Sequence, residues 1–359
     1  VGPELRHAGW DAVVITGKAA KPVYIHIEDD RVELQPARDL WGKGANESIG
    51  RLLQKHSGAQ VLVIGPAGEK RVRFASVRTN RASSLGRCGG GAVMGSKNLK
   101  GLVIQGSRGV AVHDPKNFLA LSLQCQQDLM DPRFGPLHRR SYEIMSHAGT
   151  PGFVRWFGRM GMTPLKNWSR CGIWPADRDL IEITGSAVRE RQDACSACPV
   201  HCLGAYRPQD QSGSLSGGPG YDAVVSLGHN CLEPRGRMVV ALNSLCNDLG
   251  LDPVEAGNIF SNLMEWYEKG IVDESFTDGV PMQWGNGEGM MELLPKIAMR
   301  KGCGDRLAEG SYRVGKTLGT EALNCVYHQK GMCSSGIETR PAVGAMLSMA
   351  LSPRGAHPL

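Results

Sequence analysis

The sequence has few aromatic residues and no long apolar run. Phe, Trp and Tyr together make up 6% of its 359 residues. The longest nearly uncharged apolar stretch, 342–351, is far shorter than the roughly 20 residues of a transmembrane helix, so we expect no membrane span. The net charge is +6, but basic residues are scattered rather than gathered in a stripe. This distribution argues against a nucleic-acid-binding surface.

Glycine and cysteine, in contrast, are abundant. The 47 glycines are nearly twice the usual share of about 7%, which predicts many tight turns or close backbone approaches. The eleven cysteines are an odd number, which argues against a disulfide framework. Eight of them are dispersed and fit small buried apolar positions. The other three lie close together and carry the main chemical signal.

Short β-branched runs dominate residues 11–105, and helical periodicity dominates the rest. We expect strands over 11–16, 23–27, 32–34, 61–64, 72–77 and 101–105, with the second and third forming a hairpin. Asp114-Pro115 signals the start of a helix. Further helices are expected over 236–250, 252–270, 288–299 and 305–318.

These patterns predict an α+β fold in three parts. We expect an incomplete β-rich domain over 1–110, a helical domain over 111–325, and the start of a third, truncated helical domain over 326–359. The sequence begins with Val1 rather than Met and ends in a Gly- and Pro-containing turn over 352–359. We interpret it as a fragment of a longer protein, and a complete protein with irregular termini is the alternative.

Cys195, Cys198 and Cys202 form a C-x2-C-x3-C triplet. Spacings of two and three residues let successive thiolates converge on one centre. Three interpretations are open at this point. The triplet can supply three of the four thiolates of a [4Fe-4S] cluster. It can form a zinc site with His201, although no second C-x2-C follows as in a zinc ribbon, or it can bind no metal.

A glycine-rich basic segment, 85–100, precedes the strand expected at 101–105. It is neither a Walker A motif nor a Rossmann fingerprint. Its glycines let the backbone approach an anionic ligand, and Arg87, Lys97 and Lys100 bring positive charge. The segment therefore indicates an anion-binding loop, and a surface hairpin is the alternative.

Several strings, in order along the chain, resemble the aldehyde ferredoxin oxidoreductase family of tungsten–pterin enzymes. The matching stretches are the glycine-rich loop, the cysteine triplet, 9–18, 64–69, 92–100 and 307–312. The resemblance implies a tungsten or molybdenum ion between two pterins and a [4Fe-4S] cluster nearby. It makes Cys195, Cys198 and Cys202 three of the cluster ligands and places the fourth beyond Leu359.

The resemblance also makes residues 1–110 part of a pterin-binding domain. It assigns eight residues to the pterins and their phosphates, which a magnesium ion bridges: Arg87, Gly89, Gly90, Lys97, Asn247, Gly250, Leu251 and Asp252. The last four belong to the family's D-x-x-G-L-D motif, which here begins with Asn247. An amide has no charge and carries donors as well as an acceptor, so we expect altered pterin binding. A helix end at Gly250 and a helix start at Asp252 would explain the same residues without a pterin.

Asp222 closes a stretch, 218–222, that resembles a family segment whose carboxylate lies near the metal. The resemblance therefore assigns proton transfer to Asp222. Two other acids of the family pocket are replaced here by Gly220 and Ala241, which weakens the transfer of the best-known substrates.

The activity implied by the resemblance is oxidation of a small aldehyde to a carboxylic acid in an anaerobic cytoplasm. Electrons would pass through the cluster to ferredoxin or an iron–sulfur partner subunit, in an enzyme that can form a homodimer. One alternative is a related tungsten enzyme that reduces an aromatic thioester. The other is a non-catalytic fragment that binds zinc or no cofactor.

Overall fold

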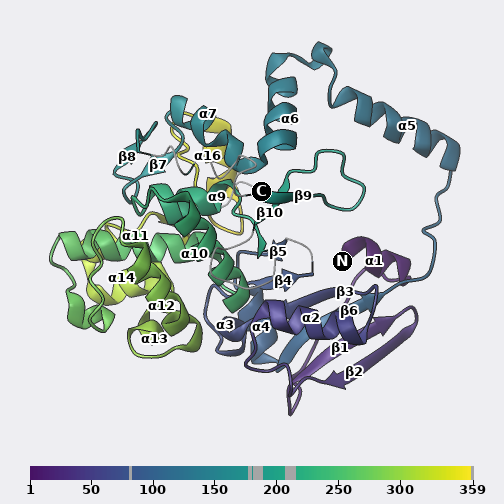
Figure 1. Cartoon of the computed structure of the whole chain (residues 1–359), viewed down its shortest axis with the longest axis horizontal. Helices are drawn as coiled ribbons and strands as arrows, with labels where there is room; N and C mark the ends of the chain where they lie inside the picture. The colour runs from purple at the N-terminus through teal and green to yellow at the C-terminus, as the bar shows by residue number, and fades with distance from the viewer. Residues whose placement is uncertain (81–82, 177–179, 181–188, 207–215, 357–359) are drawn as a thin grey trace.

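The computed structural model describes residues 1–80, 83–176, 180, 189–206 and 216–356. A sheet with short helices forms the N-terminal part, and a larger helical body follows it (Figure 1). This arrangement confirms the predicted α+β class. The domain limits at residues 110 and 325 stay predictions, and 357–359 lie outside the described residues.

Six strands form the N-terminal sheet in the order β2-β1-β6-β3-β4-β5. Their bounds are β1 Val23–Glu28, β2 Arg31–Pro36, β3 Gln60–Ile64, β4 Val77–Thr79, β5 Ser84–Leu85 and β6 Leu99–Gln105. The helices of this part are α1 Gly2–His7, α2 Ala45–Lys55, α3 Pro66–Glu69 and α4 Gly90–Ser96. The pairing β1–β6 is parallel and the others are antiparallel. The hairpin expected from the sequence is confirmed as β1–β2, with Ile25 opposite Leu34.

Two of the predicted strands are wrong in whole or in part. Residues 11–16 form no strand, and Val14 is 87% exposed, because the segment pairs with no strand of the described chain. Of the run 72–77 only Val77 belongs to a strand, β4. The backbone from Phe74 to Ser76 instead bonds to the helical body, as described below.

The described part of the helical body consists of many short elements and five longer helices. The longer helices after α4 are α5 Pro115–Asp128, α6 Pro136–Ala148, α10 Gly236–Leu249, α11 Pro253–Glu268 and α12 Gly287–Met299. The shorter helical elements are η1 Pro132–Phe134, η2 Thr150–Gly152, α7 Phe153–Arg159, α9 Tyr221–Val224, η3 Val225–His229, η4 Glu274–Thr277, α13 Cys303–Leu307, α14 Ser311–Leu318, α15 Thr320–Leu323 and α16 Val343–Leu351. The short strands are β7 Pro164–Leu165, β8 Arg170–Cys171, β9 Arg189–Asp193, β10 Leu203–Tyr206, β11 Ser216–Gly217, β12 His328–Gln329 and β13 Met332–Cys333.

Most predicted helix signals are confirmed. The Asp114 side chain accepts a hydrogen bond from the Asn117 amide at the start of α5, and α10 ends at Gly250 in the left-handed region. The prediction over 305–318 is wrong in one respect, because the helix breaks between α13 and α14. Gly310, with φ of +85°, makes that break.

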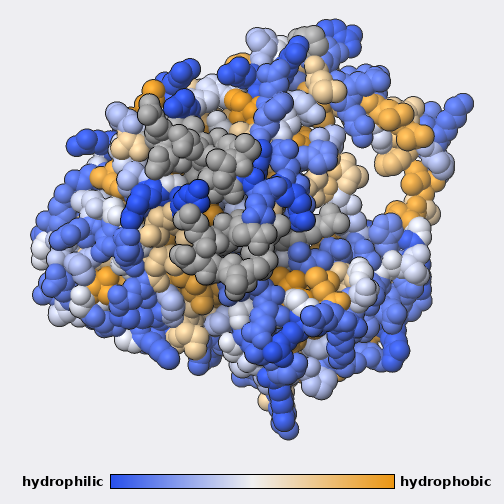
Figure 2. Space-filling model, viewed as in Figure 1, coloured by the Kyte–Doolittle hydropathy of each residue, from blue (hydrophilic) through white to orange (hydrophobic). Residues whose placement is uncertain are grey.

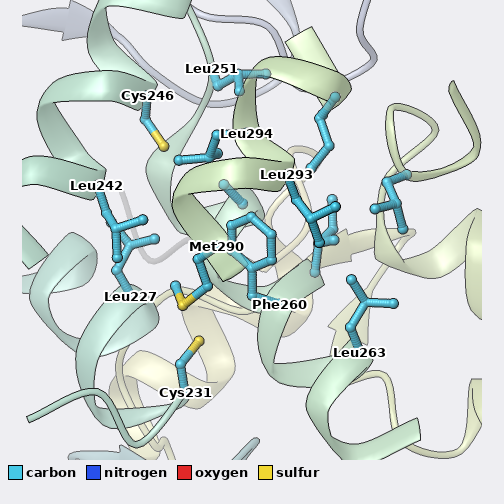
Figure 3. Close-up of a cluster of buried hydrophobic side chains, with 14 of the residues drawn as sticks. Leu227, Cys231, Leu242, Cys246, Leu251, Phe260, Leu263, Met290, Leu293 and Leu294 are labelled. Carbon is cyan, nitrogen blue, oxygen red and sulfur yellow. The ribbon is translucent and has the colours of Figure 1, made fainter. Parts of the chain in front are cut away.

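The main hydrophobic core lies where α10, α11 and α12 pack together. Figure 3 shows Leu242 and Cys246 of α10 facing Phe260 of α11 and Met290 and Leu294 of α12. These side chains are fully buried or nearly so. This core fixes the positions of the loop between α10 and α11 and of α9 beside it.

The helix α5 extends away from the rest of the chain (Figure 1) and has no buried residue. Figure 2 shows apolar side chains gathered on it, and they include Phe118, Leu119, Leu121 and Leu123. No helix in the described part of the chain is long and apolar enough to cross a bilayer.

Lys100 does not lie in an anion-binding loop, as its place in the basic segment suggested. It is fully buried in β6, where its Nζ lies 2.6 Å from Glu69 Oε1 and 3.0 Å from the Lys43 carbonyl oxygen. Burial raises the pKa of the Glu69 carboxyl, and the Lys100 ammonium offsets part of that shift. The pair joins α3 to β6 of the sheet.

We expect Lys100→Met to lower the free energy of unfolding by about 3–5 kcal/mol, because it leaves the Glu69 carboxylate buried without a partner. Denaturant titration measures this loss. Lys316→Met, at an exposed position of α14, is the matched control and should change stability by at most about 0.5 kcal/mol. A Lys100→Met loss as small as that of the control would contradict the assignment.

Candidate cofactor and active site

A cavity of about 430 Å³ lies between the N-terminal sheet and the helical body. Its volume is within the usual range of small-molecule and cofactor sites. The lining residues come from β4, the glycine-rich loop, α7, β10, α9, α10 and the start of α11. They include five of the predicted site residues: Arg87, Cys202, Asp222, Asn247 and Asp252.

One wall of the cavity is the loop that joins α10 to α11. This loop docks on the sheet domain through backbone hydrogen bonds: the Ser76 amide donates to the Gly250 carbonyl oxygen at 2.8 Å, and the Asp252 amide donates to that of Phe74 at 3.0 Å. Gly250 has φ of +75°, and a Cβ there would lie 2.7 Å from the Gly65 nitrogen. The predicted motif glycine is therefore required by backbone conformation and by close approach. Leu251 is fully buried and anchors the loop.

Asp252 has two partners at this wall. Its side chain accepts a hydrogen bond from the Val254 amide at 3.0 Å, which confirms the predicted helix N-cap, and another from Arg87 Nε at 3.1 Å. Arg87 also donates to the carbonyl oxygens of Cys333 and Ala356 and lies 3.6 Å from Glu255 Oε2. Burial alone would lower the pKa of Arg87, but Asp252 and Glu255 raise it above its usual value.

Arg78 holds the other end of the same loop. Its Nη1 donates to Asn247 Oδ1 at 3.0 Å, while Asn247 Nδ2 donates to the Gly217 carbonyl oxygen at 2.8 Å. Burial lowers the pKa of Arg78 to about 10. The sequence analysis missed this residue. A single arginine directly after a β-branched run was the available signal, but its partner lies 169 positions away.

Glu255 was also missed. With Asp252 it forms an Asp-x-x-Glu pattern, which is typical of a capping box at a helix start. In the structure Glu255 instead accepts a hydrogen bond from the Ser311 amide at 3.0 Å and faces Arg87. Burial raises the pKa of this carboxyl.

Another part of the cavity lining carries Asp222 and aromatic rings. Asp222 Oδ1 accepts a hydrogen bond from the Gly336 amide at 3.0 Å. The rings of Phe153 and Phe157 stack with centroids 5.2 Å apart, and Phe157 meets Tyr221 edge-on at the same distance. The Tyr221 hydroxyl donates to the Gly336 carbonyl oxygen at 2.9 Å, which fixes its ring. This wall therefore offers one carboxylate and a rigid aromatic surface.

The three predicted cluster ligands lie on the loop between β9 and β10. Cys202 lines the 430 Å³ cavity, and Cys195 lines a neighbouring cavity of about 330 Å³. Burial, followed by the nearby Cys198 and Cys195 thiols, raises the pKa of Cys202. Within the described residues, however, no three His, Cys, Asp or Glu side chains are arranged to hold a metal ion. The donor set fits a sulfur-ligated cluster, and binding one requires this loop to adjust.

The remaining predicted residues lie away from the cavity lining. Gly89 has φ of +71°, and a Cβ there would lie 2.2 Å from the Arg73 carbonyl oxygen, so the fold itself requires glycine. Gly90 begins α4. Lys97 Nζ donates to the Gly17 carbonyl oxygen at the surface, 3.1 Å away. Their assignment to the pterins stays a prediction.

The α10–α11 loop and the side chains of Arg78 and Arg87 that contact it form the polar wall of the cavity, and this wall fits a pterin in its chemistry. It offers a donor, the Nε of the buried Arg78, which has no hydrogen-bond partner among the described residues, and acceptors, the carboxylate oxygens of Asp252. The edge of a pterin carries both hydrogen-bond donors and hydrogen-bond acceptors.

Two family models match the chain. The model "Aldehyde ferredoxin oxidoreductase, N-terminal domain" matches residues 1–106, and "Aldehyde ferredoxin oxidoreductase, domains 2 & 3" matches 136–359. The chain belongs to the aldehyde ferredoxin oxidoreductase family. The resemblance found in the sequence is thereby confirmed.

Curated relatives and a solved structure agree with this placement. The tungsten-containing aldehyde ferredoxin oxidoreductase of Pyrococcus furiosus is 36% identical over 99% of this chain and 57% of its own length. An aliphatic sulfonate oxidoreductase, WOR-like subunit, of the same organism is 30% identical over 99% of this chain and 59% of its own length. The active site complex BamBC of benzoyl coenzyme A reductase has a TM-score of 0.81 at 26% identity, covering 93% of this chain and 52% of that chain.

Members of the aldehyde ferredoxin oxidoreductase family are tungsten bis-pterin oxidoreductases with a [4Fe-4S] cluster, as the resemblance implied. The present chain spans less than two thirds of the length of these relatives.

We expect Arg87→Met to make stability strongly dependent on pH. The substitution leaves Asp252 and Glu255 buried side by side, so the already raised pKa of Glu255 rises further. A raised pKa means that the folded state binds the proton more readily than the unfolded state. Stability should therefore be retained near pH 4 and fall as pH rises toward neutrality, relative to the unsubstituted chain.

Denaturant titrations between pH 4 and pH 8 measure this effect. Arg51→Met is the control, because Arg51 is exposed on α2 and pairs there with Glu47. If the free energy of unfolding of Arg87→Met ran parallel to that of the unsubstituted chain over this pH range, the pairing of Arg87 with Asp252 and Glu255 would be contradicted.

Proposed function

We propose that this chain carries part of the active site of a tungsten–pterin oxidoreductase that oxidises an aldehyde to a carboxylic acid. Electrons would pass through a [4Fe-4S] cluster to ferredoxin or an iron–sulfur partner subunit. The single observation that best supports this is the cavity that brings Arg87, Asn247 and Asp252 together with Cys202 and Asp222. Membership of the aldehyde ferredoxin oxidoreductase family also supports the proposal.

In this proposal the polar wall holds the pterin. Asp252 accepts hydrogen bonds from the donor edge of the pterin, and the hydrogen bond from Arg87 Nε fixes the orientation of that carboxylate. The Asn247 amide is already engaged on both sides by Arg78 and Gly217, so its part is to shape the wall. When bound, the tungsten–pterin group supplies the two-electron redox chemistry.

Asp222 handles the proton. Conversion of an aldehyde and one water to an acid releases two protons and two electrons, so a base is needed beside the substrate. Asp222 lines the cavity, and the Gly336 amide donates to its Oδ1, which orients the carboxylate beside the space where a substrate would lie. The aromatic rings of Phe153, Phe157 and Tyr221 exclude water from this side.

In this proposal the cysteine loop passes electrons outward. Cys202 borders the cavity, whereas Cys195 is exposed. A cluster held by this loop would therefore reach from the cavity to the protein surface, where an electron acceptor can approach. A thiolate set is the ligand type that iron–sulfur clusters use.

A second candidate function is reduction of an aromatic thioester. Two observations favour it: the aromatic wall of the cavity, and the similarity to BamBC of benzoyl coenzyme A reductase. Activity assays with benzaldehyde and with benzoyl coenzyme A plus a low-potential electron donor separate the two functions.

We expect anaerobic preparations of this chain extended to the length of its relatives to contain tungsten and about four iron atoms per chain. Metal analysis for Fe, W, Mo and Zn tests this. Cys198→Ser should lower the iron content severely, whereas Cys125→Ser, at an exposed position of α5, should not. Zinc without iron would reject the redox function and leave a structural zinc site.

We expect Asp222→Asn in the extended, loaded enzyme to lower kcat by about 100-fold or more, the usual contribution of general base catalysis. Tungsten and iron contents should stay unchanged. The exposed Asp11→Asn is the control and should keep its activity. Full turnover in Asp222→Asn would remove the proposed role.

A further inference from the structure

In the part of the chain that the structure describes, Arg78 is a buried cation without a carboxylate in contact with it. It is 5% exposed, and the one hydrogen bond it makes to the described residues goes to the neutral amide of Asn247. Its Nε has no hydrogen-bond partner, and the described residues place no carboxylate within ion-pair distance of it. Burying a charge without compensation is costly, so a fold retains such a group only where something else balances it.

The other buried cations of the described chain differ from Arg78. Lys100 lies 2.6 Å from the Glu69 carboxylate, and Arg87 lies beside both Asp252 and Glu255. Each is neutralised inside the protein. Asp248, the acid whose charge reaches Arg78, instead accepts a hydrogen bond from the Asn46 amide at 2.9 Å. Of these three cations, Arg78 alone has no carboxylate of the described residues in contact with it.

That charge faces the 430 Å³ cavity, whose lining includes Arg78 itself. Two carboxylates also line the cavity. Asp252 pairs with Arg87, and Asp222 accepts a hydrogen bond from the Gly336 amide and forms no ion pair with Arg78 among those the structure shows. An amide at Asn247, where the motif of the family has an acid, leaves the guanidinium free to act on a ligand instead of on its neighbour. Asn247, which replaces the first acid of the family motif, therefore explains why Arg78 has a neutral partner.

We propose that Arg78 binds an oxyanion, a carboxylate or a phosphate, on the molecule that occupies this cavity. A guanidinium is the preferred partner for such groups because its planar fork matches two oxygens. The anion can come from the substrate, as a carboxylate, or from a cofactor, as a phosphate. The inference goes beyond the proposed function, because it assigns charge to the ligand, and it stands on the cavity of this chain.

The first test measures binding to the chain itself, without tungsten or iron. Benzoate, inorganic phosphate and the uncharged benzamide are titrated by ligand-observed NMR or calorimetry at low ionic strength. We expect at least one of the two anions to bind. Arg78→Met should weaken that binding by about tenfold or more, the loss typical of one hydrogen bond to a charged group. Arg51→Met, an exposed arginine on α2, should leave it unchanged.

A second variant adds a test that does not remove the arginine. Asn247→Asp places a carboxylate at the position that Arg78 already contacts, and should therefore weaken anion binding to a similar extent while the guanidinium remains. Arg78→Lys, which keeps the charge and loses the fork, should bind more weakly than the unsubstituted chain and more tightly than Arg78→Met. These variants keep the inference testable if Arg78→Met does not fold.

The outcomes identify the source of the anion. Binding of phosphate alone assigns Arg78 to a cofactor phosphate, and binding of benzoate assigns it to a substrate carboxylate. In the second case the extended, loaded enzyme with Arg78→Met should have a raised KM for 4-carboxybenzaldehyde and an unchanged KM for benzaldehyde. Equal anion affinity in Arg78→Met and the unsubstituted chain, or no binding of either anion, would overturn the inference. Absence of aldehyde oxidation would overturn the proposed function only.

Discussion

The candidate site depends on the docking of one loop, residues 249–252, against the N-terminal sheet domain. Backbone hydrogen bonds join it to Phe74 and Ser76, and a mutual close approach with Gly65 leaves no room for a side chain at Gly250. The loop connects α10 and α11, so the core that packs these helices sets its position (Figure 3). The loop thereby joins the helical body to the sheet domain at the place where residues of both parts line the cavity.

Two buried arginines from the sheet domain complete this junction. Arg78 holds Asn247 at one end of the turn, and Arg87 holds Asp252 at the other. The two contacts differ in charge. Arg87 lies beside two carboxylates, Asp252 and Glu255, whereas Arg78 contacts the neutral amide of Asn247. One end of the loop therefore presents a fixed acceptor, the Asp252 carboxylate, and the other end lies against a cation, Arg78 of β4. Such a polarised wall selects the orientation of any ligand that carries both donors and an anionic group.

The sequence predicted local features better than distant contacts. The caps at Asp114, Gly250 and Asp252 and the β1–β2 hairpin depend on a few neighbouring residues, and all were predicted. The charge assignments in the glycine-rich segment were poorer: Lys100 was expected to face a ligand and is instead buried against Glu69. Arg78 and Glu255 were missed because their partners lie far away in sequence. Each of them also fits a local pattern, a strand end for Arg78 and a capping box for Glu255, so neither pattern gave a reason to look for a distant partner.

The position of the cysteine loop follows from the same architecture. β10 pairs with β9 and with β11, and Asn247 and Asn243 of α10 both donate to the carbonyl oxygen of Gly217 in β11. The small sheet that carries Cys202 is thus fastened to the helix that ends in the polar wall. A ligand seated on that wall and a cluster held by the cysteine loop would therefore keep a constant separation. In the proposed function, one helix, α10, would therefore support both the cofactor-binding loop and the cysteine loop through the buried amides of Asn243 and Asn247.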